Sequence, residues 1–129
     1  MVALKMGSIK IALAFAVGES EHSALSAALA PVAVKCVPPE QYAMPVSAIL
    51  QGQKPMANGD VKPLAEPMLV FHGFENSELD AALKNLKNCG VKIPLKAVTT
   101  PTNMSWDAYT FYDNLSKERK AIKKGYRRH

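Results

Sequence analysis

The sequence predicts an α/β domain built on a four-stranded sheet. Segments of strand length alternate with segments of helical periodicity, in the order β-α-β, a short helix, then β-α-β-α. Two predicted strands, Ser8–Val17 and Met68–Phe71, are apolar on both faces, which is typical of strands covered on both sides. The other two strands each carry a lysine, Lys35 and Lys96, as outer strands often do. The first and third strands are therefore expected to be central.

Two topologies satisfy these constraints. One is a parallel sheet in the order 2-1-3-4 with helices on both faces, and the other is a ferredoxin-like α+β sandwich with an antiparallel sheet and one open face. We favour the parallel sheet, because the first strand would otherwise leave an apolar face uncovered. A short helix at Val46–Leu50 can then serve as the crossover to the third strand.

The first half of the chain supplies two strands and two helices. In Ser8–Val17, large side chains alternate with alanines, so one face is bulky and the other lets a helix approach closely. Gly18 breaks this strand, and Ser20 is expected to cap a helix that ends at Ala30. The remaining elements are a strand at Val32–Val37, the short helix after Pro45, and a loop rich in Gly and Pro at residues 51–67.

An amphipathic helix is the clearest element of the second half. Asn76 or Ser77 is expected to cap it, its leucines and alanines recur at i, i+3, i+4 and i+7, and Gly90 supplies a left-handed stop. Val91–Thr99 is predicted as the fourth strand. A last helix is expected from about Ser105 into the basic end of the chain.

The 129 residues fit one domain that ends in a basic helical tail at residues 117–129. The tail holds seven basic residues and one acidic residue, a net charge of +6, whereas residues 1–116 hold nine basic and ten acidic residues, a net charge of −1. Such a tail either binds nucleic acid or forms a solvated helix end whose cations complement the helix dipole. Its basic residues are Lys117, Arg119, Lys120, Lys123, Lys124, Arg127 and Arg128.

The two cysteines, Cys36 and Cys89, have no metal-binding spacing. We expect reduced thiols in a cytoplasmic protein, with Cys36 buried inside a strand. No apolar run reaches the length of a membrane span, and Ile11–Val17 is interpreted as a buried strand rather than as the apolar part of a signal peptide. The sequence predicts no metal, no cofactor and no membrane partner.

A turn rich in hydroxyl groups follows the fourth predicted strand, in "IPLKAVTTPTNMSW". Ligands of open α/β sheets gather beyond the carboxyl ends of the strands, and a helix N-terminus favours anions. One interpretation is therefore an anion-binding turn; the other is helix capping by Thr102 or Asn103. The candidate ligand-binding residues are Lys96, Thr99, Thr100, Thr102, Asn103 and Trp106.

The segment "FHGF" ends the third predicted strand, at the same sheet edge as the turn in the parallel topology. Gly73 and Phe74 are therefore included in the candidate ligand site. His72 is the candidate for acid–base chemistry, because imidazole titrates near neutral pH; the simpler interpretation is a hydrogen-bonded strand end. No catalytic triad order and no carboxylate pair stands out, so the sequence favours a protein without catalytic activity.

The second half resembles a family of small, uncharacterised bacterial proteins that share a domain of unknown function. The resemblance rests on a strand ending in Gly-Phe, an amphipathic helix with a Leu-Asp pair, and the segment "IPLKAV-T-TN--W" at residues 93–106. It implies a cytosolic bacterial protein and transfers no activity. The shared positions are Gly73, Phe74, Leu79, Ile93, Pro94, Leu95, Lys96, Thr100, Asn103 and Trp106.

Three functional hypotheses follow. The first is a non-catalytic ligand-binding or regulatory module, whose small anionic ligand or protein partner meets the anion-binding turn at the start of the last helix. The second is an RNA-associated protein, such as an accessory to tRNA modification, that uses the basic tail. The third is an enzyme that uses His72 with Lys96, which fails if the two side chains face opposite sides of the sheet. The last helix is expected either to pack on its own sheet or to form a homodimer through its aromatic side.

Overall fold

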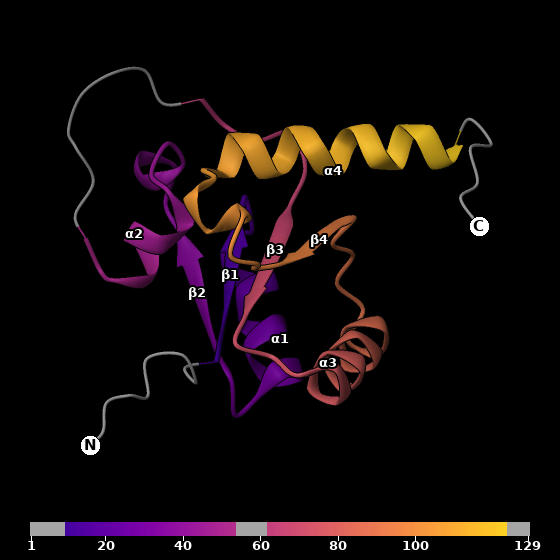
Figure 1. Ribbon diagram of the computed structural model, residues 1–129. Coiled ribbons are helices and arrows are strands. Elements are labelled where there is room, and N and C mark those ends of the chain that lie inside the picture. The colour runs from indigo at the N-terminus through magenta and orange to yellow at the C-terminus, as the bar shows by residue number, and fades with distance from the viewer. Residues whose placement is uncertain (1–9, 54–61, 124–129) are drawn as a thin grey trace.

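A computed structural model describes residues 10–53 and 62–123, and it forms a four-stranded sheet in the order β2-β1-β3-β4 (Figure 1). The strands are β1 (Ile11–Phe15), β2 (Ala33–Val37), β3 (Met68–His72) and β4 (Leu95–Val98). The predicted strand order is confirmed, as are the central positions of β1 and β3. The two strands that carry a lysine form the outer edges.

The sheet is mixed rather than parallel. β1 pairs with β2 in parallel and β3 pairs with β4 in parallel, but β1 and β3 run antiparallel. Phe15 pairs with both Val37 and Met68, so β2 ends at the same edge of the sheet where β3 begins. The connection between them does not need to cross the sheet. The predicted crossover role of the short helix is therefore wrong.

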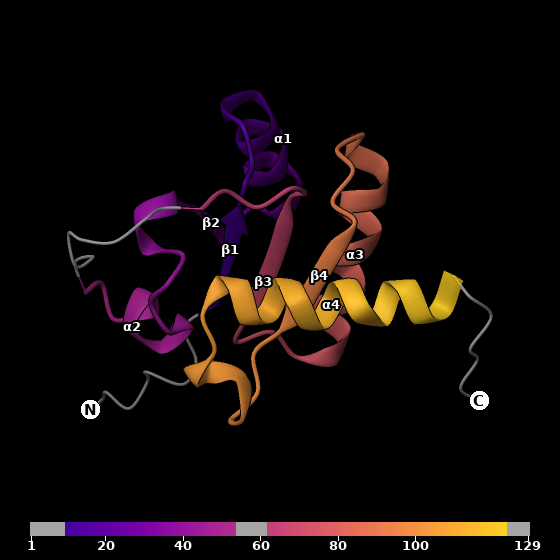
Figure 2. The same cartoon turned by 90° about the horizontal axis from the view of Figure 1, so that it is seen from above.

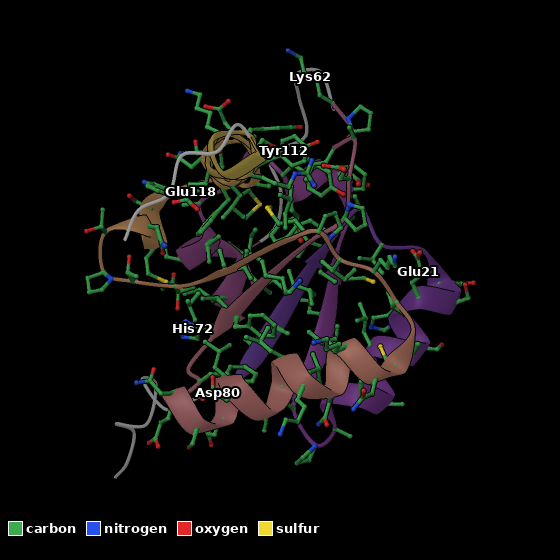
Figure 3. All side chains as sticks on the ribbon, turned by 90° about the vertical axis from the view of Figure 1, so that its right-hand side faces the viewer. Glu21, Lys62, His72, Asp80, Tyr112 and Glu118 are labelled. Atoms are coloured by element: carbon green, nitrogen blue, oxygen red, sulfur yellow. The ribbon has the colours of Figure 1, made fainter. Side chains whose placement is uncertain are left out.

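Helices cover both faces, as predicted. The helices are α1 (Glu19–Leu29), α2 (Val46–Leu50), α3 (Asn76–Cys89) and α4 (Ala108–Lys123), with 3-10 turns at Pro39–Gln41 and Asn103–Ser105. Helices α1 and α3 pack on one face, and α4 crosses the other (Figures 1 and 2). Figure 3 shows the sheet between α4, seen end-on, and α3. With both faces covered, the ferredoxin-like alternative with an open face does not apply.

The alternation of large and small residues in β1 sorts the two faces. Leu13 and Phe15 face α4 and α2, whereas Ala12 and Ala14 face the pair of α1 and α3. All four side chains are almost completely buried. Phe71 is buried as well, on the α3 face. Phe15 and Phe71 are thus core residues on opposite faces of the sheet.

Several boundaries differ from expectation. The N-cap residues of α1 and α3 are Gly18 and Glu75, rather than Ser20 and Asn76 or Ser77. The fourth strand is only Leu95–Val98, since Pro94 has no N–H to donate and Ile93 instead packs into the core beneath α3. The last helix begins at Ala108 rather than Ser105, because Asn103–Ser105 forms a 3-10 turn and Trp106 is extended. Gly90 ends α3 in the left-handed conformation (φ 87°), as predicted.

Candidate functional site

His72 and Thr99 join the carboxyl ends of β3 and β4. A hydrogen bond of 2.8 Å links Nδ1 of His72 and Oγ1 of Thr99, and the Thr99 N–H donates to the carbonyl of Phe71. Burial lowers the pKa of His72 below its usual value of 6.5, so the imidazole is neutral at physiological pH. His72 thus has the hydrogen-bonded, strand-end geometry of the simpler interpretation.

The hydroxyl-rich turn is held by reciprocal bonds between Thr100 and Asn103. The Thr100 N–H donates to Oδ1 of Asn103 (2.7 Å), and the Asn103 N–H donates to Oγ1 of Thr100 (3.1 Å). Asn103 Nδ2 also donates to the carbonyl of Val98 (3.1 Å), and the residue is only 9% exposed. The amide of Asn103 therefore serves the turn itself.

The predicted capping of the last helix by Thr102 or Asn103 is wrong. The first turn of α4 uses Asp107 instead, whose Oδ1 accepts the Thr110 N–H (2.9 Å). The Ala108 N–H donates to the carbonyl of Tyr42 (2.9 Å). The start of α4 is therefore separated from the hydroxyl-rich turn, and two of its N–H groups already have acceptors.

Three other candidate residues have structural contacts. The Trp106 indole packs edge-on against Phe111, with 5.1 Å between the ring centroids. The backbone carbonyl of Trp106 accepts the Val46 N–H. Phe74 packs edge-on against Phe71 at 5.2 Å. Gly73 adopts a positive φ of 84°, which only glycine adopts at little cost, and so turns the chain from β3 toward α3.

Lys96 points away from the turn. Its ammonium donates to the carbonyl of Ile93 (2.6 Å), three residues toward the N-terminus. Because side chains alternate along a strand, Lys96 lies on the α3 face, like its partner Leu69, whereas His72 shares the α4 face with Val70. The hypothesis of an enzyme that uses His72 with Lys96 therefore fails by its own criterion.

Lys96 instead lines a groove of about 600 Å³ between α3 and β4. Leu83 (36% exposed) and Val98 (38%) are the exposed large hydrophobic residues of the described chain; Leu83 lines the groove, and Val98 lies on the same face of β4 as Lys96. Helix α3 packs on the central strands through Ala82 and Leu86. The groove residues are Leu83, Leu86, Lys87, Gly90, Val91, Lys92, Ile93, Pro94 and Lys96.

The charged residues that line this groove are all basic. Residues 81–106 contain no Asp or Glu, and their four basic residues are Lys84, Lys87, Lys92 and Lys96. Three of these lysines line the groove. Sequence reasoning missed this site because it treated Lys96 as a neighbour of the turn. The signal that identifies it is the acid-free run of 26 residues.

The basic tail is described only in part. Lys117 forms an ion pair with Asp113 one helical turn away (3.1 Å), and Arg119 pairs with Glu66 from the segment before β3 (2.5 Å). The side chains of Lys120 and Lys123, and all of Lys124, Arg127 and Arg128, lie outside what the structure describes. The helix that carries the first four of these cations projects beyond β4 (Figure 2).

A second cavity, of about 450 Å³, lies at the opposite edge of the sheet, where β1 and β2 end. Ala16, Cys36 and Tyr42 are among its lining residues. Cys36 is exposed, contrary to the expectation of a core position, because β2 is an outer strand with a neighbour on one side only. Partial desolvation still raises the pKa of its thiol. Both cysteines are free, as predicted.

Across residues 10–53 and 62–123, no group of three or more His, Cys, Asp or Glu side chains could hold a metal ion. Within the same residues, no helix has both the length and the apolar character needed to cross a membrane.

A family profile matches part of the chain. Residues 67–122 match the sequence profile of DUF3783, a domain of unknown function. The matched segment spans β3, α3 and β4 and nearly all of α4, so it contains both the hydroxyl-rich turn and the groove. The expected resemblance to a domain of unknown function is confirmed for this part of the chain. No curated protein and no solved structure matches the chain.

Proposed function

We propose that this chain is a non-catalytic binding module for a negatively charged partner, which meets the sheet edge at β4. The observation that carries the proposal is the groove between α3 and β4, where three lysines surround apolar side chains and no acid lies in residues 81–106. Concave, mostly apolar sites with a few convergent polar groups are the usual form of binding sites. The separation of His72 from Lys96 supports the non-catalytic character.

The groove is a better anion site than the hydroxyl-rich turn. In the turn, the amide of Asn103 and the Thr100 N–H bond to one another, and Asp107 places a carboxylate at the start of α4. A bound anion would have to replace these bonds. The lysines of the groove are exposed and have no carboxylate among their lining neighbours, so an anion gains charge interactions there without displacing an acid.

A charge-neutralising variant tests the proposal. Lys87→Gln/Lys92→Gln/Lys96→Gln should weaken binding of poly-L-glutamate and of phosphorylated metabolites in a thermal-shift screen. A ligand at a hundredfold its dissociation constant stabilises the wild type by about 2.7 kcal/mol, which is visible as a rise in melting temperature. The matched control is Lys35→Gln/Lys62→Gln/Lys117→Gln, which removes the same charge from other exposed positions. Equal loss in both triple variants would mean that net charge alone governs binding.

A second candidate function is RNA association through the basic tail. The projection of α4 past β4 favours it, because the end of the helix, beyond the Arg119–Glu66 ion pair, extends away from the sheet (Figure 1). Neutralising Lys123, Lys124, Arg127 and Arg128 should then reduce RNA affinity and flatten its dependence on salt. RNA binding that survives these substitutions with an unchanged salt slope would exclude the tail as the site.

A further inference from the structure

The outer edge of β4 has backbone groups that pair with no other described strand. Within residues 10–53 and 62–123, β4 pairs with β3 alone. The Thr99 N–H points toward β3, so by the alternation of a strand Lys96 and Val98 direct their N–H and C=O groups outward. The Val98 carbonyl accepts Asn103 Nδ2, in agreement with this direction. The N–H and C=O of Lys96 and the N–H of Val98 thus form an edge that can pair with another strand.

Both faces beside this edge can accommodate an added strand. On the α3 face lies the groove, whose exposed Leu83, together with Val98, can contact alternate side chains of the new strand. On the other face, α4 crosses the sheet and continues past β4 in both views (Figures 1 and 2). A strand added to β4 would therefore pass beneath the second half of α4 instead of being left open to solvent.

The positive charge of the groove distinguishes between the possible partners of β4. Antiparallel pairing with β4 of a second copy would bring two Lys96 side chains close together on one face and add a second acid-free set of lysines, and like charges across strands destabilise pairing. An RNA strand could use the lysines but could neither continue the backbone ladder nor fill the apolar groove. A polypeptide segment that carries carboxylates satisfies the ladder, the groove and the lysines together.

We propose that an extended, acidic segment of a partner protein adds to β4 as a fifth strand. Its backbone pairs with Lys96 and Val98, and its carboxylates lie against Lys87, Lys92 and Lys96. This inference rests on the proposed function and names the class of partner. Recognition by strand addition derives affinity from main-chain hydrogen bonds and specificity from the pockets that receive alternate side chains.

The test uses the full chain and the peptide Glu-Thr-Val-Thr-Glu-Thr-Val, whose odd positions place both carboxylates and valines on the face toward the groove. We expect binding by fluorescence anisotropy, and slowing of amide hydrogen exchange at Lys96 and Val98 by about tenfold or more. The same peptide N-methylated at alternate backbone nitrogens keeps its side chains and charges but loses ladder donors, and it should bind at least about tenfold more weakly. Lys87→Gln/Lys92→Gln/Lys96→Gln should show a comparable loss, and Lys35→Gln/Lys62→Gln/Lys117→Gln should not.

Each alternative has a distinct result. Equal affinity for the N-methylated peptide, or unchanged exchange at Lys96, overturns strand addition while leaving an anion-binding groove intact. Binding of a uridine oligonucleotide at the same lysines in preference to the peptide assigns the edge to nucleic acid. Concentration-dependent dimerisation with protection of the Lys96 amide assigns it to a second copy. Failure of the peptide, poly-L-glutamate and phosphorylated metabolites alike overturns the proposed function as well.

Discussion

Nδ1 of His72 and Oγ1 of Thr99 lie 2.8 Å apart and fasten the last residue of β3 to the residue that follows β4. Both residues lie on the α4 face of the sheet, because they continue the alternation of Val70 and of Leu95. The bond closes the β3–α3–β4 unit at the end opposite Met68 and Leu95. It therefore links β3 and β4, the two strands that α3 connects along the chain.

The lowered pKa of His72 predicts a dependence of stability on pH. Below pH 6.5 the unfolded chain takes up a proton at this residue before the folded protein does, so the free energy of unfolding should fall as pH drops from 6.5 toward the folded pKa. Well above pH 6.5, where both states are deprotonated, the residue should contribute no slope. Urea unfolding of the wild type and of His72→Gln across this range measures the difference. The same slope in both proteins would contradict a half-buried, neutral imidazole.

Asn103 should be the most sensitive polar residue of the hydroxyl-rich turn. Asn103→Ala removes two side-chain bonds and leaves the Thr100 N–H and the Val98 carbonyl without their partner, so we expect a loss of about 2 kcal/mol in the free energy of unfolding. Thr100→Ala removes only the acceptor of the Asn103 N–H and should cost about 1 kcal/mol. Chemical denaturation of the two variants gives both numbers. A larger loss at Thr100 would mean that the turn is held in another way.

Local patterns in the sequence predicted most of the helices and strands, because these depend on the spacing of apolar and capping residues a few positions apart. The spacing of Leu79, Ala82, Leu83 and Leu86 predicts α3, and Gly90 predicts its end. Ser8–Val17 is apolar on both faces, which predicts a central strand covered on both sides, since an uncovered apolar face is unfavourable in water. These features depend on residues a few positions apart, so they are visible without tertiary information.

The direction of the strands and the composition of the site depend on distant contacts. Nothing local distinguishes a connection that crosses the sheet from one that returns at the same end, so the antiparallel pairing of β1 and β3 was not visible. The side chain of Lys96 bonds to the carbonyl of Ile93 rather than reaching Thr99, and that depends on the path of residues 91–94 under α3. The acid-free run of residues 81–106 was visible, but its meaning required the fold that places the lysines around one groove.

The capping of α4 can be tested by a pair of single substitutions. Asp107→Ala removes the acceptor of the Thr110 N–H and a carboxylate in a favourable position at the helix start, so it should cost about 1 kcal/mol of stability. Thr102→Ala should change stability by less than about 0.5 kcal/mol, because this residue provides no side-chain cap. Thermal unfolding of both variants distinguishes the two. The opposite order of effects would restore the hydroxyl-rich turn as the helix cap.

Ala16 offers a stabilising substitution. It has a φ of 61°, and its N–H donates to the hydroxyl of Tyr42 (2.9 Å), which fixes the chain where β1 turns toward α1. A residue with a Cβ loses roughly 1–2 kcal/mol in the left-handed conformation. Glycine avoids this loss but has a larger conformational entropy when unfolded. The net effect of Ala16→Gly should be a gain of about 0.5–1 kcal/mol.

For a chain of this size that gain raises the melting temperature by about 3 °C, which differential scanning calorimetry resolves. Ala14→Gly is the matched control, because Ala14 lies within β1 and is 1% exposed. Glycine there weakens the strand and removes a buried methyl group, so the melting temperature should fall. Tyr42→Phe removes the hydroxyl that accepts the Ala16 N–H. The double variant with Ala16→Gly tests whether the turn depends both on this hydrogen bond and on the residue type at position 16. Destabilisation by Ala16→Gly alone would show that the left-handed geometry is not the one the protein adopts.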